Sequence, residues 1–137
     1  MGGVTPPKKK VRAQTYERDG FACVTCRSTE NLEWQHRESS GHGGRGSKAP
    51  PLTAADGVTT CSTCNPRYEG DLQAKALRCG WKLRRNRLML SHDIPYYSAG
   101  TESWWLPDTG GGRRPLHEAL ALELIEAAGG LHSKGAA

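Results

Sequence analysis

Two Cys-x-x-Cys pairs constrain the fold of this chain more than any other feature. Cys23 and Cys26 form the first pair, Cys61 and Cys64 form the second, and 34 residues lie between them. Two thiolates separated by two residues can reach one ion from a single tight turn, and a second such turn completes the tetrahedral sulfur set that zinc accepts. The spacing therefore predicts one structural Zn²⁺ site with four cysteine ligands.

Two disulfides are the other way to use four cysteines. We expect them less, because the sequence starts without an apolar signal segment that would send the chain to an oxidising compartment. The fifth cysteine, Cys79, recurs with Leu72 and Ala76 at helical spacing. This spacing favours a small core residue with a free thiol over a metal ligand or a nucleophile.

The size of the chain limits its hydrophobic core. Its 137 residues form one small domain, and with 36% hydrophobic residues and 17 glycines they cannot bury a large core. A structural metal would offset that deficit, because its binding free energy becomes folding free energy when the site exists only in the folded chain. No apolar run approaches membrane-spanning length, so we expect a soluble, cytoplasmic protein with no membrane partner.

The formal net charge of +5 is unevenly distributed. Residues 1–90 carry 16 Lys and Arg against 8 Asp and Glu, whereas residues 91–137 carry 3 against 6. The basic part contains the cysteine pairs, which predicts a polyanionic partner there, most simply nucleic acid. An ordinary solvated basic surface is the alternative. The residues expected to contact the nucleic acid are Arg37, Arg45, Lys48, Arg67, Lys82, Arg84, Arg85 and Arg87.

The rest of the pattern predicts an α+β fold in four parts. These are a disordered basic tail (1–11), a zinc module (12–80), a β-rich extension (81–114) and a C-terminal helix with its tail (115–137). In the zinc module we expect a helix over 12–19, a strand over 32–36, a β-prone run over 57–60 and a helix opened by Asn65-Pro66 and closed by Gly80.

Three further strands and one helix are expected in the C-terminal part. The strands cover residues 81–90, which carry a basic stripe, 94–97 and 103–106, and they would form a small antiparallel sheet. The helix is expected to start at Pro115 and to pack through Leu116, Leu120, Leu124 and Ala127. Residues 37–56 are rich in Gly, Ser and Pro, which is typical of a functional or disordered loop.

These motifs together resemble those of the HNH, or ββα-metal, endonucleases. The resemblance is carried by an arginine-rich helix and Asp-Gly from Arg12 to Gly20 before the first cysteine pair, Gln35-His36 at the end of a strand, a glycine-rich loop at 41–46, and Asn65 directly after the second cysteine pair. It covers roughly residues 12 to 110 and includes a C-terminal region similar to that of actinobacterial and actinophage members. It implies a small zinc-stabilised ββα-metal (His-Me finger) domain.

The resemblance implies metal-dependent hydrolysis of DNA. His36 takes the position of the general base, and Gln35 and Asn65 take the positions that hold a divalent ion, often Mg²⁺, at the scissile phosphate. Asp56 falls near the position of an Asn that braces the loop. The implied partner is duplex or branched DNA in a bacterial host cell, with phage replication or packaging proteins as further partners.

Gln35 departs from this pattern, because family members usually place Asp, Glu or His there. A neutral amide oxygen binds a hard dication more weakly than a carboxylate does. The second interpretation is therefore a zinc DNA-binding module with the same fold and little or no cleavage. A neutral His36 could accept a proton from water near cytosolic pH, but it could also pack beneath Trp34. Asn65 could equally serve as a helix cap.

Overall fold

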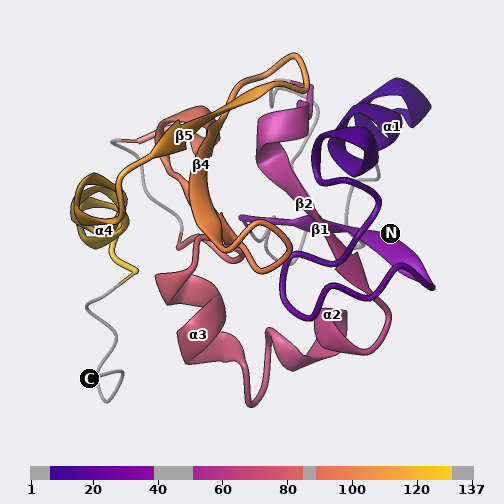
Figure 1. Ribbon diagram of the computed structural model, residues 1–137, viewed down its shortest axis with the longest axis horizontal. Helices are drawn as coiled ribbons and strands as arrows, with labels where there is room; N and C mark the ends of the chain where they lie inside the picture. The colour runs from indigo at the N-terminus through magenta and orange to yellow at the C-terminus, as the bar shows by residue number, and fades with distance from the viewer. Residues whose placement is uncertain (1–6, 39–50, 85–88, 131–137) are drawn as a thin grey trace.

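The computed structural model describes residues 7–38, 51–84 and 89–130. It has the mixed α+β architecture expected from the sequence, with two small antiparallel sheets (Figure 1). No helix within the described residues is long and apolar enough to cross a membrane. The N-terminal part contains, in order, α1 (Lys9–Arg18), β1 (Leu32–His36), the 3₁₀ helix η1 (Ala54–Asp56), β2 (Gly57–Cys61), α2 (Cys64–Arg67) and α3 (Gln73–Arg78).

Strands β1 and β2 pair antiparallel, with Leu32 opposite Cys61 and His36 opposite Gly57. β1 lies where the alternation of side chains predicts it, and β2 covers the predicted β-prone run at 57–60. Trp34 and His36 share one face of β1, as expected, and their rings meet edge to face with centroids 4.7 Å apart. A Cβ atom at Gly57 would lie 2.2 Å from the Trp34 ring, so only glycine fits beneath this indole.

A buried ion pair fixes the end of α1 to the first sheet. Arg18 Nε and Asp19 Oδ1 are 2.9 Å apart, and both side chains are almost fully buried. The guanidinium also donates to the backbone carbonyls of Ala54 and Gly57, while Asp19 accepts the N–H of Thr59. The charged atoms of both side chains have hydrogen-bond partners, so no buried charge is left unsatisfied. The pair therefore fixes the orientation of α1 relative to the first sheet.

Two predicted helices differ from the structure. The first helix begins at Lys9 and not at residue 12, so residues 9–11 are helical and not part of a disordered tail. The helix expected from Asn65 to Gly80 is two short helices, α2 and α3. Gly70 lies between them, and its low helix propensity accounts for the break. The predicted stop is confirmed, since Gly80 has a φ of +76° directly after α3.

The C-terminal part forms the second sheet and the last helix. Its elements are η2 (Ser91–Asp93), β3 (Tyr96–Ser98), β4 (Ser103–Pro107), β5 (Arg113–Leu116) and α4 (Glu118–Ala127). β4 lies between β3 and β5, and both neighbours pair with it antiparallel. The predicted strands near residues 94–97 and 103–106 are thus confirmed, with β3 starting two residues later than expected.

The strand predicted over residues 81–90 does not form in its described part. Leu83 makes an isolated bridge with Glu38, and residues 85–88 lie outside the described residues. Trp81 and Leu83 are both buried, but in different clusters: Trp81 packs around the cysteines and Leu83 packs beneath α4. The prediction of a strand is therefore not confirmed in the described part of this segment, where Trp81 and Lys82 lie in a bend and only Leu83 makes a bridge.

The last helix packs through a different face from the predicted one. Pro115 and Leu116 belong to β5, and α4 begins only at Glu118. Ala121, Ile125 and Ala128 are buried against β4, whereas Leu120 remains 46% exposed. Because β5 extends the chain to Leu116, the strand sets the rotation of α4, and small alanine side chains let it approach β4 closely.

Candidate metal centre

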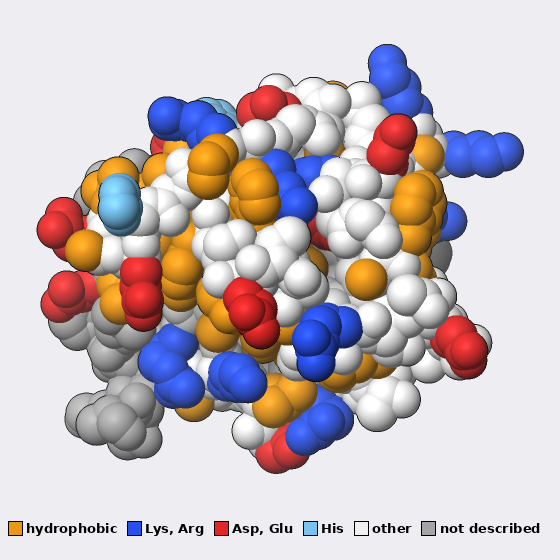
Figure 2. Space-filling view, viewed as in Figure 1, with side chains coloured by type: hydrophobic (Ala, Val, Ile, Leu, Met, Phe, Trp, Pro, Cys, Tyr) orange, Lys and Arg blue, Asp and Glu red, His pale blue; other side chains and the backbone are white. Residues whose placement is uncertain are grey.

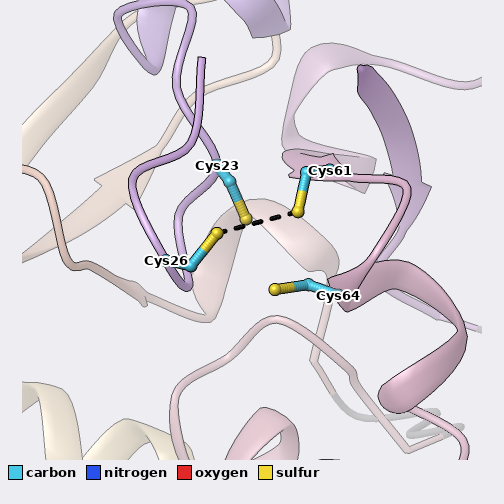
Figure 3. Close-up of side chains that lie close together, drawn as sticks. All are labelled: Cys23, Cys26, Cys61 and Cys64. Carbon is cyan, nitrogen blue, oxygen red and sulfur yellow. Dashed lines mark hydrogen bonds between the residues drawn. The ribbon is translucent and has the colours of Figure 1, made fainter. Parts of the chain in front are cut away.

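The four cysteines of the two pairs converge from separate segments. Cys23 and Cys26 lie in the loop between α1 and β1, Cys61 ends β2 and Cys64 begins α2, and all four point toward one centre (Figure 3). Their Sγ atoms lie within 4.8 Å of one another. The 3.7 Å between the Sγ atoms of Cys26 and Cys61 is close to the ~3.8 Å expected for two sulfurs bound tetrahedrally at ~2.3 Å. The cluster could hold a metal ion such as zinc.

None of the five cysteines is in a disulfide, which agrees with the preference for a metal site over two bridges. The Sγ separation of Cys26 and Cys61 is far longer than a disulfide bond of about 2.05 Å. Cys79 packs, partly buried, against the core around the cluster and is not one of the converging ligands. Burial raises the pKa of its thiol to about 11, which disfavours the reactive thiolate.

Backbone turns hold the sulfurs in place. In the first turn the N–H of Arg27 donates to the carbonyl of Cys23, and the N–H of Thr25 points at Cys23 Sγ from 3.4 Å. Arg27 has a φ of +70°, which lets the chain leave the turn sharply. The N–H of Ser62 donates to the carbonyl of Asn31, which ties the second turn to the residue just before β1.

The protonation of the cluster depends on its surroundings. Burial raises the pKa of Cys26 and of Cys64. Burial acts in the same direction on Cys61, but hydrogen bonds from the backbone N–H groups of Cys64 and Thr63 and from the thiols of Cys26 and Cys64 together lower that pKa. Metal ligation requires thiolates, so a divalent ion would compete with protons for these sulfurs. Binding of the ion would therefore release the protons.

The candidate base and its neighbour lie at the end of β1. His36 is half-buried against the edge of Trp34, as the packing alternative expects, and its role in catalysis stays a prediction. The Nε2 of Gln35 donates to the carbonyl oxygen of His36 at 2.8 Å. This bond occupies the amino group of the Gln35 amide and leaves its oxygen as the atom that could bind a cation.

Asn65 is not the cap of α2, because Thr63 occupies that position. Instead, Asn65 Nδ2 donates to Glu33 Oε1 at 2.7 Å. A carboxylate can only accept, so this bond sets the amide orientation and turns Oδ1 away from Glu33. Glu33 lies two residues before Gln35 and so shares its face of β1. Glu33 is not among the residues predicted from the sequence, although its two-residue spacing from Gln35 could have revealed it.

Asp56 joins two segments next to the first sheet. Its carboxylate accepts the N–H of Thr53 at 2.7 Å and the hydroxyl of Ser91 at 2.7 Å. Its backbone carbonyl accepts the N–H of Arg37, the residue after β1. These contacts are of the kind expected of a loop brace, with the carboxylate accepting a backbone hydrogen.

Arg37 was expected to contact nucleic acid, and this prediction is wrong. The side chain is fully buried and cannot reach a phosphate. Burial lowers the pKa of its guanidinium to about 9. Its three nitrogens donate, at 2.7 to 3.1 Å, to five backbone carbonyls, those of Gly80, Ala55, Ser91, Ile94 and Pro95.

Replacing Arg37 by Met should destabilise the fold strongly without touching the cysteines. The substitution leaves five carbonyls from three segments without their donor, and each buried unsatisfied polar group costs about 1 to 3 kcal/mol. We expect a loss of at least 3 kcal/mol in the free energy of unfolding, measured by urea denaturation. Arg114→Met, at an exposed position, is the matched control, and equal losses in both variants would contradict this role.

The other basic residues predicted to contact nucleic acid are described only in part. Arg67 pairs with Asp71 at 2.8 Å, and Lys82 pairs with Glu69 at 2.9 Å. Arg84 is exposed and donates to a backbone carbonyl just after α4. Their contact with nucleic acid stays a prediction. The remaining four predictions in this basic region, Arg45, Lys48, Arg85 and Arg87, lie outside the described residues.

Comparison with known proteins identifies no relative whose function could be transferred to this chain. No family model, no curated protein and no solved structure matches the chain. The residues that the structure brings together are therefore the basis for assigning a function. They are the four cysteines at one centre, and the hydrogen-bonded pair Glu33 and Asn65, with Gln35 on the same face of β1 as Glu33.

Proposed function

We propose that the protein is a metal-dependent DNA endonuclease of the HNH kind, with a structural Zn²⁺ bound by its four clustered cysteines. The observation that carries this proposal is the placement of the cluster. It joins the start of α2, where Asn65 follows Cys64, to the sheet whose first strand ends in Gln35 and His36. The residues with implied catalytic roles thus belong to one metal-linked unit.

The order of elements supports the same proposal. Two antiparallel strands are followed directly by a short helix, and the second cysteine pair lies at the junction of β2 and α2. Asn65 is one hydrogen bond away from Glu33, on the face of β1 that also carries Gln35. This arrangement is compatible with a cation held between the amide oxygens of Gln35 and Asn65 and a DNA phosphate.

The chemistry assigns separate tasks to these residues. His36, as a neutral imidazole, accepts the proton of the attacking water. Gln35 and Asn65 present amide oxygens to a divalent ion, Mg²⁺ or a similar metal. When bound, such an ion would stabilise the negative charge that develops on the departing oxygen. Glu33 keeps the Asn65 amide oriented so that its oxygen faces outward from the carboxylate.

A zinc DNA-binding module without cleavage is the second candidate function. The observation that favours it is the neutral side chain of Gln35, whose amino group is bonded to the backbone of His36. A plasmid-nicking assay with Mg²⁺ and with Mn²⁺ separates the two. Metal-dependent conversion of supercoiled to nicked plasmid supports the endonuclease, whereas DNA binding with no nicking supports the module.

Glu33→Ala should weaken the use of the catalytic metal while leaving zinc content unchanged. Without the carboxylate, the Asn65 amide can rotate, and loss of such an outer partner typically costs 10 to 100-fold in metal affinity. We expect the Mn²⁺ concentration for half-maximal nicking to rise by about tenfold. Glu30→Ala, an exposed acid in the loop before β1, removes the same charge and should have little effect.

Glu33→Gln distinguishes orientation from direct ligation. Its Oε1 can still accept from Asn65 Nδ2, so a positioning role predicts substantial recovery relative to Glu33→Ala. Equal loss in Glu33→Gln and Glu33→Ala would show that the charge of Glu33 matters, and would contradict a role limited to orienting Asn65.

A further inference from the structure

Helix α1 carries cations that no described acidic residue neutralises. Lys9, Lys10 and Arg12 are exposed, and within residues 7–38, 51–84 and 89–130 none of them is in an ion pair. The first turn of α1 has no acidic residue and no side-chain cap. A helix N-terminus is already partly positive, so clustered cations there repel one another and the helix dipole. This end of the molecule favours contact with an anion.

Apart from Arg84, which is exposed and donates to the carbonyl of Gly129, the other described candidates for a basic interface differ from α1. Arg37 is buried, and Arg67 and Lys82 each pair with a carboxylate within 3 Å. Their charge is therefore partly neutralised inside the protein. Figure 2 shows Lys and Arg side chains projecting from the upper right of the molecule, where Figure 1 places α1.

One face of α1 leads toward the candidate metal ligands. Lys9, Arg12 and Tyr16 lie three and four residues apart, so they form one stripe along the helix, which we call the α1 stripe. α1 contacts β1, and the charges of both Arg12 and Glu33 act on the Tyr16 hydroxyl. Glu33 in turn accepts from Asn65. The stripe thus ends near Glu33, the residue that orients Asn65, while α1 itself packs on the opposite, Trp34 face of β1.

We infer that the α1 stripe is a docking surface for the phosphate backbone of duplex DNA beside the cleavage site. This inference rests on the proposed function and adds to it the surface that positions the substrate. Lys and Arg side chains and a Tyr hydroxyl are typical phosphate contacts, which set the register of a protein on DNA without reading its sequence. A helix of 10 residues is about 15 Å long, enough for several such contacts along one strand.

A membrane surface is the other polyanion that a basic helix can bind. A helix that lies on a membrane needs a broad apolar face with large side chains. The exposed part of α1 offers only Val11 and Ala13 as apolar residues, while Thr15 and Arg18 are buried inside the fold. Charge without an exposed apolar face therefore favours nucleic acid.

The test compares two double variants of equal charge change. Lys9→Gln with Arg12→Gln removes both cations of the α1 stripe, and Lys75→Gln with Arg78→Gln removes two from α3, which lies across the molecule from α1 (Figure 1). Affinity for a labelled DNA duplex is measured by fluorescence anisotropy at salt concentrations from about 50 to 300 mM. Contacts with phosphate weaken strongly over roughly this range. Zinc content and circular dichroism verify that both variants fold.

We expect the α1 variant to bind about tenfold more weakly for each lost phosphate contact near 0.1 M salt, with a salt slope shallower by about 1.8. The charge-preserving variant Arg12→Lys should retain most of the affinity for DNA. This result would attribute the weaker binding of the double variant to its lost charges and not to a change in its fold. Equal losses in the α1 and α3 variants would contradict a specific α1 surface and indicate a general charge effect.

Two further outcomes are informative. If wild type nicks plasmid and the α1 variant binds DNA with unchanged affinity and slope, the α1 inference is wrong while the endonuclease proposal stands. If wild type binds phosphatidylserine vesicles, and only this binding depends on the α1 stripe, the surface serves a membrane. A wild type that fails to bind DNA at low salt would contradict the proposed function itself.

Discussion

Cys61→Ala is expected to unfold the N-terminal part of the protein. Cys61 lies in the same buried cluster as Cys23 and Cys64, and Val58, Tyr68 and Trp81 pack in this cluster too. Zinc bound at four cysteines contributes about 10 to 16 kcal/mol in small peptides, comparable to the whole stability of a domain, about 5 to 15 kcal/mol. We expect the variant to lose its zinc and its cooperative thermal transition, measured by elemental analysis and circular dichroism.

Cys79→Ala is the matched control, because it removes a thiol from the same core without removing a converging sulfur. It should keep one zinc per chain and a cooperative transition. Titration of the wild type with a strong chelator should reproduce the Cys61→Ala result. A wild type that is folded and contains no zinc when freshly purified would refute the structural role of the cluster.

The predictions from the sequence succeeded best for features that depend only on residues close together in the chain. Strand β1 follows from the alternation of Leu32, Trp34 and His36, and the cysteine cluster follows from two short spacings. Neither depends on knowing how distant segments pack. The stop after α3 is local as well, because Gly80 adopts the left-handed backbone that ends a helix there.

Arg37 shows why the basic surface was harder to predict. Its charge is visible in the sequence, but its burial depends on carbonyls supplied by η1, Gly80 and the segment around Ile94. These segments are far apart in the chain, and only the folded structure brings them together. The predicted face of α4 was wrong for a similar reason, since the end of β5 at Leu116 sets the rotation of the helix.

His36→Ala should abolish nicking while leaving zinc content and DNA affinity nearly unchanged. A general base contributes about 10² to 10⁴-fold to rate, so we expect the nicking rate to fall by at least about 100-fold. His36 packs at the edge of Trp34 and is only half-buried, so its loss should cost little stability. Plasmid nicking, zinc analysis and duplex binding are measured on the same preparation. His92→Ala, which removes a half-exposed histidine from η2, is the control.

Gln35→Asp tests the metal site on the same strand. A carboxylate at this position would give a hard dication a charged oxygen donor, so nicking at low Mg²⁺ should increase. The gain should disappear in the double variant with His36→Ala. A more tightly held ion cannot replace the base that accepts the proton of the attacking water. If the wild type binds DNA and never nicks it, while Gln35→Asp nicks only when His36 is present, the natural protein is a DNA-binding module that retains the base but lacks a sufficient metal site.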